Sequence, residues 1–326
     1  MTDRFDRRQW LRIAGASLGF GALYRFAPAL GPGGPGSALA RALGRKNGER
    51  PAPFSFVQLS DTHVGLAGPQ NPRGTEAFER AVERINALPE RPELALFTGD
   101  LTHDSEDPVE HADRMRKFRR IAAGLNIPVV RFVPGEHDAG EDGGAIFRDA
   151  FGETSYAFDH RGVHFVALDN VSQGKPVVGA AQLAWLTKDL ARFPASAPIV
   201  VFTHRPLFDL RPDWEWFTKD GDLVMNTLAR FENVTVLYGH IHREDVHHAG
   251  NATHLASRSL SFAFPDPASG VPKKPVTFDA ERPFQNLGPR RIREKNGRPS
   301  IEEITLDLRE FSGTNGIQQI LKGVQS

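Results

Sequence analysis

Five short polar clusters, each placed directly after an apolar run typical of a β-strand, constrain the fold of this chain more than any other feature. Ligands gather beyond the carboxyl ends of strands in α/β sheets, because the loops there converge and helix N-termini point into the same space. Carboxylates and imidazoles suit divalent ions of the Mn, Fe or Zn type. We therefore expect one site for two divalent or mixed-valence metal ions, built from Asp61-Thr62-His63, Gly99-Asp100, Gly135-Glu136-His137-Asp138, Thr203-His204 and Gly239-His240-Ile241-His242.

The segments between the clusters alternate between strand-like and helix-like patterns. β-branched and aromatic residues predict strands over 54–60, 94–98, 128–133, 199–202 and 234–238. Apolar residues spaced three and four apart predict helices over 75–88, 109–125, 180–192 and 223–231. A hairpin over 156–168 and late strands within 245–255 add antiparallel pieces. This alternation predicts an α/β core.

Composition narrows the class of protein. The 326 residues are 40% hydrophobic and 25% charged, which suits one large folded domain with an extension. Lys plus Arg and Asp plus Glu each total 40, and the first forty residues hold five Arg and two Asp, so the rest carries 35 − 38 = −3. A mildly acidic body makes nucleic acid an unexpected partner. The lack of cysteine excludes disulfides and thiolate ligands, so nitrogen and oxygen must hold any metal.

The first forty residues resemble a twin-arginine export signal. Arg7-Arg8 precedes an uncharged run over 13–24, and Ala38-Leu39-Ala40 supplies a small-residue cleavage site. This run is shorter than the roughly 20 residues that a membrane-spanning helix needs. We expect the export machinery as a partner and a periplasmic or otherwise exported protein with no stable membrane span. A frayed amphipathic N-terminus of a cytosolic protein is the alternative.

The expected domain organisation follows from these shifts in composition. A signal over 1–40 and a linker over 41–53 precede a domain over 54–264, and an extension over 265–326 is expected to pack on the same domain. Within the extension, residues 301–308 alternate as an edge strand that covers a sheet edge or supports a dimer. The oligomeric state stays open.

The order and spacing of the five clusters resemble the calcineurin-like metallophosphoesterase family, whose pattern is Asp-x-His, Gly-Asp, Gly-Asn-His-Asp/Glu, His and Gly-His-x-His. The resemblance covers about residues 54–264 and looks closest to the cyclic-nucleotide and general phosphodiesterase branch, through Leu59-Ser60-Asp61-Thr62-His63, Thr98-Gly99-Asp100-Leu101-Thr102 and Val133-Pro134-Gly135. It implies a four-layer α/β/β/α sandwich of two mixed sheets flanked by helices. It also implies hydrolysis of a small phosphate ester, either a phosphodiester or a phosphomonoester.

The same resemblance implies a role for each cluster residue. Asp61, His63 and His242 would hold one metal ion, Glu136, His204 and His240 the other, and Asp100 would bridge them. A hydroxide that bridges the two ions would attack phosphorus in line with the leaving oxygen. His137 would protonate that oxygen, and Asp104 and Asp138 would complete the catalytic set.

Two positions depart from the family pattern. Glu136 stands where the family has Asn, which adds a negative charge beside the metals. His103 stands where many relatives keep an Asp that orients the histidine of the third cluster, so that Asp104 is left to replace it. A non-catalytic or retuned metal-binding protein on the same fold is therefore the alternative to an enzyme.

Smaller predictions concern the surroundings of the site. His103 and Arg205 are candidates for substrate contacts. The segment 205–217, rich in Arg and aromatic residues, forms either a wall over the site or a loop packed against the body. His247-His248 and His254 are expected at the surface or within a sheet rather than as metal ligands.

Overall fold

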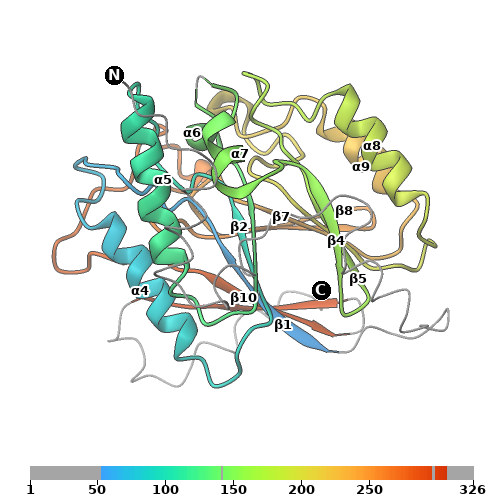
Figure 1. Cartoon of the computed structure of the whole chain (residues 1–326), viewed down its shortest axis with the longest axis horizontal. Helices are drawn as coiled ribbons and strands as arrows, with labels where there is room; N and C mark the ends of the chain where they lie inside the picture. Colours follow the sequence, from blue (N-terminus) through green and yellow to red (C-terminus); the bar gives the residue numbers. More distant parts are fainter. Residues whose placement is uncertain (1–52, 141, 296–297, 307–326) are drawn as a thin grey trace, which may run out of the picture.

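Two mixed β-sheets lie face to face, and helices cover their outer faces (Figure 1). The computed structural model describes residues 53–140, 142–295 and 298–306. The predicted signal over 1–40 and nearly all of the predicted linker lie outside the described residues. The expected four-layer α/β/β/α sandwich is confirmed. Within the described part of the chain, no helix combines the length and the apolar character needed to cross a membrane.

The first sheet has five strands in the order β11-β10-β1-β2-β3. The parallel strands β1 (Phe54–Leu59), β2 (Leu94–Thr98) and β3 (Val129–Val133) are joined by helical crossovers, as the alternation predicted. β10 (Arg290–Lys295) pairs antiparallel with β1, and β11 (Arg298–Glu303) forms the edge. The predicted tail strand thus begins earlier than expected, and β10, which we did not predict, covers the free edge of β1.

The second sheet has six strands in the order β4-β5-β6-β7-β9-β8. Its centre is parallel and consists of β5 (Val163–Ala167), β6 (Ile199–Phe202), β7 (Val234–Tyr238) and β9 (Ala252–Ala256). Its two edges are antiparallel, because β4 (Tyr156–His160) and β8 (Asp245–Ala249) each form a hairpin with a neighbour. Both hairpins lie where the sequence predicted antiparallel pieces.

Helices form the two outer layers. The first sheet is covered by α4 (Gly74–Asn86), α5 (Pro108–Ala122) and α7 (Ala145–Phe151). The second is covered by α8 (Ala180–Leu190) and α9 (Gly221–Leu228). The chain also forms the single turn α6 (Glu136–Ala139) and the 3-10 helices η1 (Pro212–Trp214) and η2 (Pro267–Ser269). The sequence did not predict α6 and α7, because both are too short to show a helical period.

The long helices follow directly from their sequences. Asp107 caps α5 by accepting a hydrogen bond of 2.9 Å from Val109 N, and Pro108 takes the first helical position, where it loses no hydrogen bond. In α4, Phe78, Val82 and neighbours at helical spacing are buried against the first sheet.

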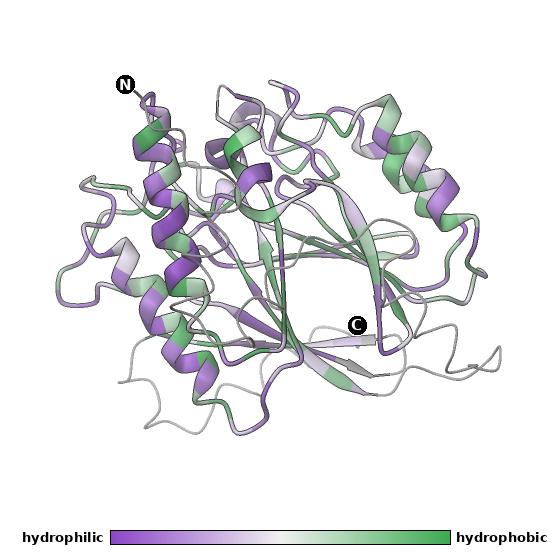
Figure 2. Ribbon diagram, viewed as in Figure 1, coloured by the Kyte–Doolittle hydropathy of each residue, from purple (hydrophilic) through white to green (hydrophobic). Residues whose placement is uncertain are grey.

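Apolar layers hold the sandwich together. One lies between the sheets and contains Phe56, Phe165 and Phe202. A second lies between the first sheet and its helices, and a third lies between the second sheet and its helices. Figure 2 shows the hydrophobic residues along the central strands and the hydrophilic residues on the outward sides of the helices. This rigid frame fixes where the strands end, and those ends carry the polar clusters.

Candidate metal centre

The predicted ligands come together from both sheets. Asp61, Asp100 and Glu136 follow β1, β2 and β3 of the first sheet. His204 and His240 follow β6 and β7 of the second sheet in the same way. All these strands are parallel within their sheets, so their carboxyl ends deliver the side chains to one place.

One ligand cluster consists of Asp61, His63, Asp100 and His242, whose ligand atoms all lie within 4.8 Å of one another. His63 Nε2 is 3.2 Å from His242 Nε2 and 3.6 Å from Asp100 Oδ2. His242 Nε2 is 3.4 Å from Asp61 Oδ1. All four side chains are buried, Asp61 Oδ1 also accepts a hydrogen bond of 3.1 Å from His240 N, and a bound ion would satisfy the nitrogen and oxygen atoms that face one another.

A second ligand cluster consists of Glu136, His204 and His240. Glu136 Oε2 lies 2.7 Å from His204 Nε2, and Glu136 Oε1 lies 2.7 Å from His240 Nδ1. Asp100 connects the two clusters, because the same Oδ2 atom that faces His63 is 3.3 Å from His204 Nε2. The structure thus brings together all seven predicted ligands in the two groups that the sequence suggested.

The second cluster contains atoms that fit a metal ion. His240 Nε2 is buried and has no hydrogen-bond partner among the described residues, and Glu136 Oε2 and His204 Nε2, also buried, contact only side chains of the two clusters. A buried polar atom left without a partner costs about 1–3 kcal/mol, so a free imidazole nitrogen beside these atoms indicates a missing ligand. Oxygen and nitrogen donors of this kind suit Mn, Fe, Zn and similar ions.

Two of the three side chains of the second cluster are in the protonation state that binds a cation. Burial opposes ionisation, but the contacts with His240 and His204 hold the pKa of Glu136 well below its ordinary value. Burial lowers the pKa of His240 to about 4 against the nearby charge of Glu136, so its imidazole is neutral. His204 differs: burial lowers its pKa, but Asp100 and Glu136 outweigh that effect and raise it well above its ordinary value. A metal ion must therefore displace a proton from His204.

Backbone carbonyls fix the tautomers of two ligands. His204 Nδ1 donates to Thr98 O (2.8 Å), and His242 Nδ1 donates to Phe262 O (2.8 Å). Because a carbonyl can only accept, each imidazole keeps a proton on Nδ1, so Nε2 is the nitrogen that can bind a metal ion, in His204 once its second proton has left. Sequence reasoning missed Phe262, since a main-chain oxygen leaves no signal in the residue type.

Five of the predicted ligands adopt the left-handed backbone conformation, with the φ angles Asp61 53°, His63 40°, Asp100 50°, His240 64° and His242 53°. Among the described residues, three other non-glycine residues have a positive φ. Such conformations cost of order 1 kcal/mol or more each and concentrate at functional sites. Gly135, which precedes Glu136, lets the loop after β3 approach the loop after β2 closely. A Cβ at this position would lie 2.1 Å from Asp100 Oδ1.

Comparison with known proteins agrees with this geometry. The calcineurin-like phosphoesterase family matches residues 54–244, more than half of the chain. The chain belongs to this family. The metallophosphoesterase assignment made from the five clusters is therefore confirmed, and the chain is a hydrolase.

Relatives of this metallophosphoesterase act on different esters. A probable cyclic nucleotide phosphodiesterase of Rhodopseudomonas palustris is 32% identical over 58% of this chain and 72% of its own length. A serine/threonine-protein phosphatase of Danio rerio is 28% identical over 59% of this chain and 71% of its own length. Among solved structures, a dimetal phosphatase from Danio rerio covers 78% of this chain and 99% of its own, with a TM-score of 0.51 and 15% identity. This last likeness shows the fold alone.

His137 lies beside the metal ligands of the metallophosphoesterase. Its Nδ1 is 2.6 Å from Asp104 Oδ1, so Asp104 takes the orienting place that the sequence left to it. Burial opposes protonation, but the charges of Asp100 and Glu136 and the contact with Asp104 raise the pKa of His137 to about 9. Bound cations would share those carboxylates and bring that pKa back toward neutrality.

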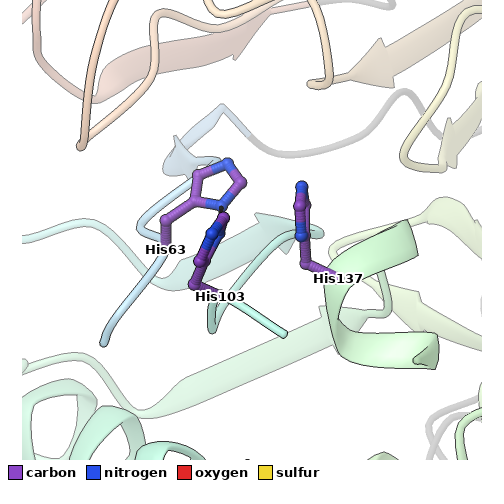
Figure 3. Close-up of side chains that lie close together, drawn as sticks. All are labelled: His63, His103 and His137. Atoms are coloured by element: carbon purple, nitrogen blue, oxygen red, sulfur yellow. Dashed lines mark hydrogen bonds between the residues drawn. The ribbon is translucent and has the colours of Figure 1, made fainter. Parts of the chain in front are cut away.

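His103 contacts both His137 and the candidate metal ligand His63. Figure 3 shows the three imidazoles side by side, with His103 next to both of the others. His103 Nδ1 is 3.3 Å from His63 Nδ1, and its ring stacks on that of His137 with centroids 4.6 Å apart. His63 thus faces a metal-ligand cluster through Nε2 and His103 through Nδ1. A substrate-contact role for His103 stays a prediction.

Asp138, predicted as part of the catalytic set, connects the loops that carry the candidate ligands. Its carboxylate is fully buried and accepts hydrogen bonds from the backbone N–H groups of Leu101 and Thr102 and from Gly135 N, all at 2.8–2.9 Å. It clamps the loops after β2 and β3 together. Its oxygens are engaged by the main chain and by Thr102 Oγ1, which gives Asp138 a positioning role here, and its place in the catalytic set stays a prediction.

Arg205 is the part of the segment 205–217 that faces the ligands. Its guanidinium lies 3.3 Å from Glu136 Oε1. The tryptophans of the segment, Trp214 and Trp216, are buried and pack beside Tyr238, so they form a packed loop rather than an open wall. The Arg205 contact opposes the extra charge that Glu136 brings to the site.

Proposed function

We propose that this metallophosphoesterase hydrolyses phosphodiester or phosphomonoester bonds with two metal ions. The observation that carries the proposal is the shared Asp100 Oδ2, which lies 3.6 Å from His63 Nε2 and 3.3 Å from His204 Nε2 and so connects the two ligand clusters. The ions, when bound, would act as Lewis acids on the phosphoryl group and lower the pKa of a water molecule. The protein would supply the side chains that hold the two ions, set the distance between the ions and bury most of their ligands.

The side chains beside the clusters suggest how the leaving group departs. His137 is held through Nδ1 by Asp104, which leaves Nε2 as the nitrogen that donates a proton to the leaving oxygen. His103 stacks on His137 and restricts its ring. Asp138 keeps the loop that carries His137 against the loop that carries Asp100.

The relatives support both classes of ester. A probable cyclic nucleotide phosphodiesterase and a protein phosphatase are similar to this chain to nearly the same degree. The first cleaves a diester by name and the second a monoester, and specificity is decided by loops rather than by the shared fold. We also propose export, on the grounds of Arg7-Arg8 and the apolar run that follows.

The test uses purified protein loaded separately with Mn, Fe, Zn or Co. We expect turnover of bis(p-nitrophenyl) phosphate, p-nitrophenyl phosphate or both. His137→Ala should retain its metals and lose about 10²–10⁴-fold in kcat, because a general acid contributes that range. Unchanged turnover in this variant would remove the acid role.

The alternative is a metal-binding protein without phosphoesterase activity, which Glu136 motivates. Its carboxylate makes the second cluster more anionic than an amide would, so bound ions would polarise a phosphoryl group less. Full metal occupancy together with no turnover of either ester, for any of the four metals, would favour this alternative.

A further inference from the structure

A loop beyond the part of the chain that matches the family contacts residues of the candidate metal centre and its surroundings. This loop, residues 263–276, is closed at its base by a hydrogen bond of 2.8 Å from Val276 N to Ala263 O. Arg243 fixes it through an ion pair of 3.1 Å with Asp266. Phe264 at its start packs against the metal ligand His242, with ring centroids 5.2 Å apart. The loop therefore belongs to the surroundings of the site although the family match ends at residue 244.

The loop brings Lys273 to the same turn that holds Arg205. Lys273 Nζ donates to Trp214 O (2.6 Å), and Arg205 Nη1 donates to Glu215 O (2.9 Å). These are consecutive carbonyls, and Glu215 has a left-handed backbone with φ 58°. The ammonium and guanidinium groups are thus neighbours, and the other end of the guanidinium is 3.3 Å from Glu136 Oε1.

The two cations are held together against their mutual repulsion. Burial and the charge of Arg205 lower the pKa of Lys273, and the opposing influence of Glu215 and Glu136 is smaller. Two fixed cations at the rim of a ligand cluster form the kind of site that an anion with more than one charge stabilises.

The charge of the metal centre suggests which anion this is. Asp61, Asp100 and Glu136 carry three negative charges against the four positive charges that two divalent ions would bring, which leaves at most 4 − 3 = +1, and less once a hydroxide is bound. One positive charge matches a phosphodiester, which is monoanionic. A phosphomonoester is largely dianionic at neutral pH, since its second pKa is about 6. Its second charge requires further cations beside the ions.

We propose that Arg205 and Lys273 form a subsite for the second negative charge of a phosphomonoester, which directs this enzyme toward monoesters. The proposal rests on the proposed function and names its substrate class. A diester carries an organic group in place of the second charged oxygen and gains little from the subsite. Lys273 is thus a specificity-determining residue supplied by the chain after the family match.

The experiment compares Lys273→Met with Lys274→Met, a matched control at the next residue of the same loop, which is also exposed. We expect K273M to lower kcat/KM for p-nitrophenyl phosphate by about tenfold, as loss of one charge-assisted hydrogen bond does. The kcat/KM for bis(p-nitrophenyl) phosphate should change by less than about twofold. K274M should change neither. Lys273→Arg, which keeps the charge, should retain most of the monoester activity.

A second measurement does not depend on turnover. Calorimetric titration of the metal-loaded proteins with inorganic phosphate should show about tenfold weaker binding to K273M than to the wild type and to K274M. Equal losses for both esters, or unchanged phosphate affinity in K273M, would overturn the subsite. If the wild type hydrolyses neither ester, the proposed function fails, and the phosphate titration still decides whether Lys273 binds the anion.

Discussion

Arg205 offsets part of the negative charge that Glu136 adds to the site. A carboxylate in place of Asn adds a negative charge, and the guanidinium 3.3 Å from Glu136 Oε1 opposes it. The pair therefore behaves as a compensated substitution, in which a longer charged ligand and a neighbouring cation replace a neutral amide. A bound metal centre would keep much of its attraction for a phosphate because Arg205 shares the added charge.

This compensation predicts that the two residues act jointly on metal affinity. Glu136→Asn removes an anionic ligand and leaves the Arg205 charge beside the ions. Because Arg205 shares the charge of Glu136, we expect the substitution to weaken metal binding about tenfold less in the Arg205 protein than in an Arg205→Met background, a coupling of about 1.4 kcal/mol. Metal titration of the four proteins of this cycle measures the coupling, and simple additivity of the two substitutions would contradict it.

His254 is buried within the second sheet and does not lie at the surface. It has no exposed surface, and neither ring nitrogen has a hydrogen-bond partner among the described residues. Burial, together with the charges of His247 and His248, lowers the pKa of His254 to about 4. The unfolded chain, with the ordinary value of 6.5, therefore binds a proton first as pH falls.

His254 should make the protein less stable in acid. Its contribution is complete above the unfolded pKa and is lost as pH falls from about 6.5 toward 4, which amounts to about 2.5 kcal/mol between about pH 7.5 and pH 4.5. Urea unfolding of the metal-free protein at both pH values measures this loss. In His254→Leu the loss should be smaller by about that amount, and an identical pH dependence in both proteins would refute the assignment.

At the scale of elements, strand ends were easier to predict than strand neighbours. The apolar runs of β2, β6 and β7 mark their own limits, and the polar residue after each one marks the site. β10 has the sequence Arg-Arg-Ile-Arg-Glu-Lys, in which the buried Arg290 and Arg291 pair with Glu303 and Glu302 of β11. These arginines are buried because glutamates of another strand pair with them. Charged residues show no alternation of apolar and polar positions, so the sequence pattern gave no sign of this strand.

The pairing of β10 with β1 predicts that a chain limited to the predicted domain, which ends at residue 264, does not fold alone. A chain that ends at residue 264 loses β10, β11 and the buried Ile292, and it exposes the edge of β1. We expect this chain to aggregate, whereas one that ends at residue 306 and keeps every described element stays soluble. Size-exclusion chromatography and far-UV circular dichroism compare the two. A monomeric, cooperatively unfolding 264-residue chain would show that β10 is dispensable.

At the scale of the whole molecule, the metal centre joins the two sheets. Ligands after β1, β2 and β3 meet ligands after β6 and β7, and five ligand residues have left-handed backbones. Without cations this meeting point holds strained backbones and buried polar atoms that lack partners among the described residues. Metal ions should therefore stabilise the packing of one sheet on the other as well as supply the chemistry.

Metal loading should raise the free energy of unfolding. At a free metal concentration one hundred times the dissociation constant, the gain for one site is about 2.7 kcal/mol. Because binding displaces the proton of His204, whose pKa is raised, affinity should fall by up to about tenfold per pH unit as pH decreases. Denaturant unfolding of loaded and chelated protein at several pH values tests both effects. A stability that does not depend on metal would contradict the ligand assignment.

The sequence by itself determined the α/β class, most element positions and the seven candidate ligand residues that the structure brings together, because each depends on a local signal: an apolar run, a helical period, or a polar residue at a strand end. Only the tertiary structure decided the contact of Glu136 with Arg205, the positioning role of Asp138 and the approach of Lys273. These depend on which segments become neighbours once the two sheets pack. That choice is made by burial over the whole chain, which no single stretch of residues records.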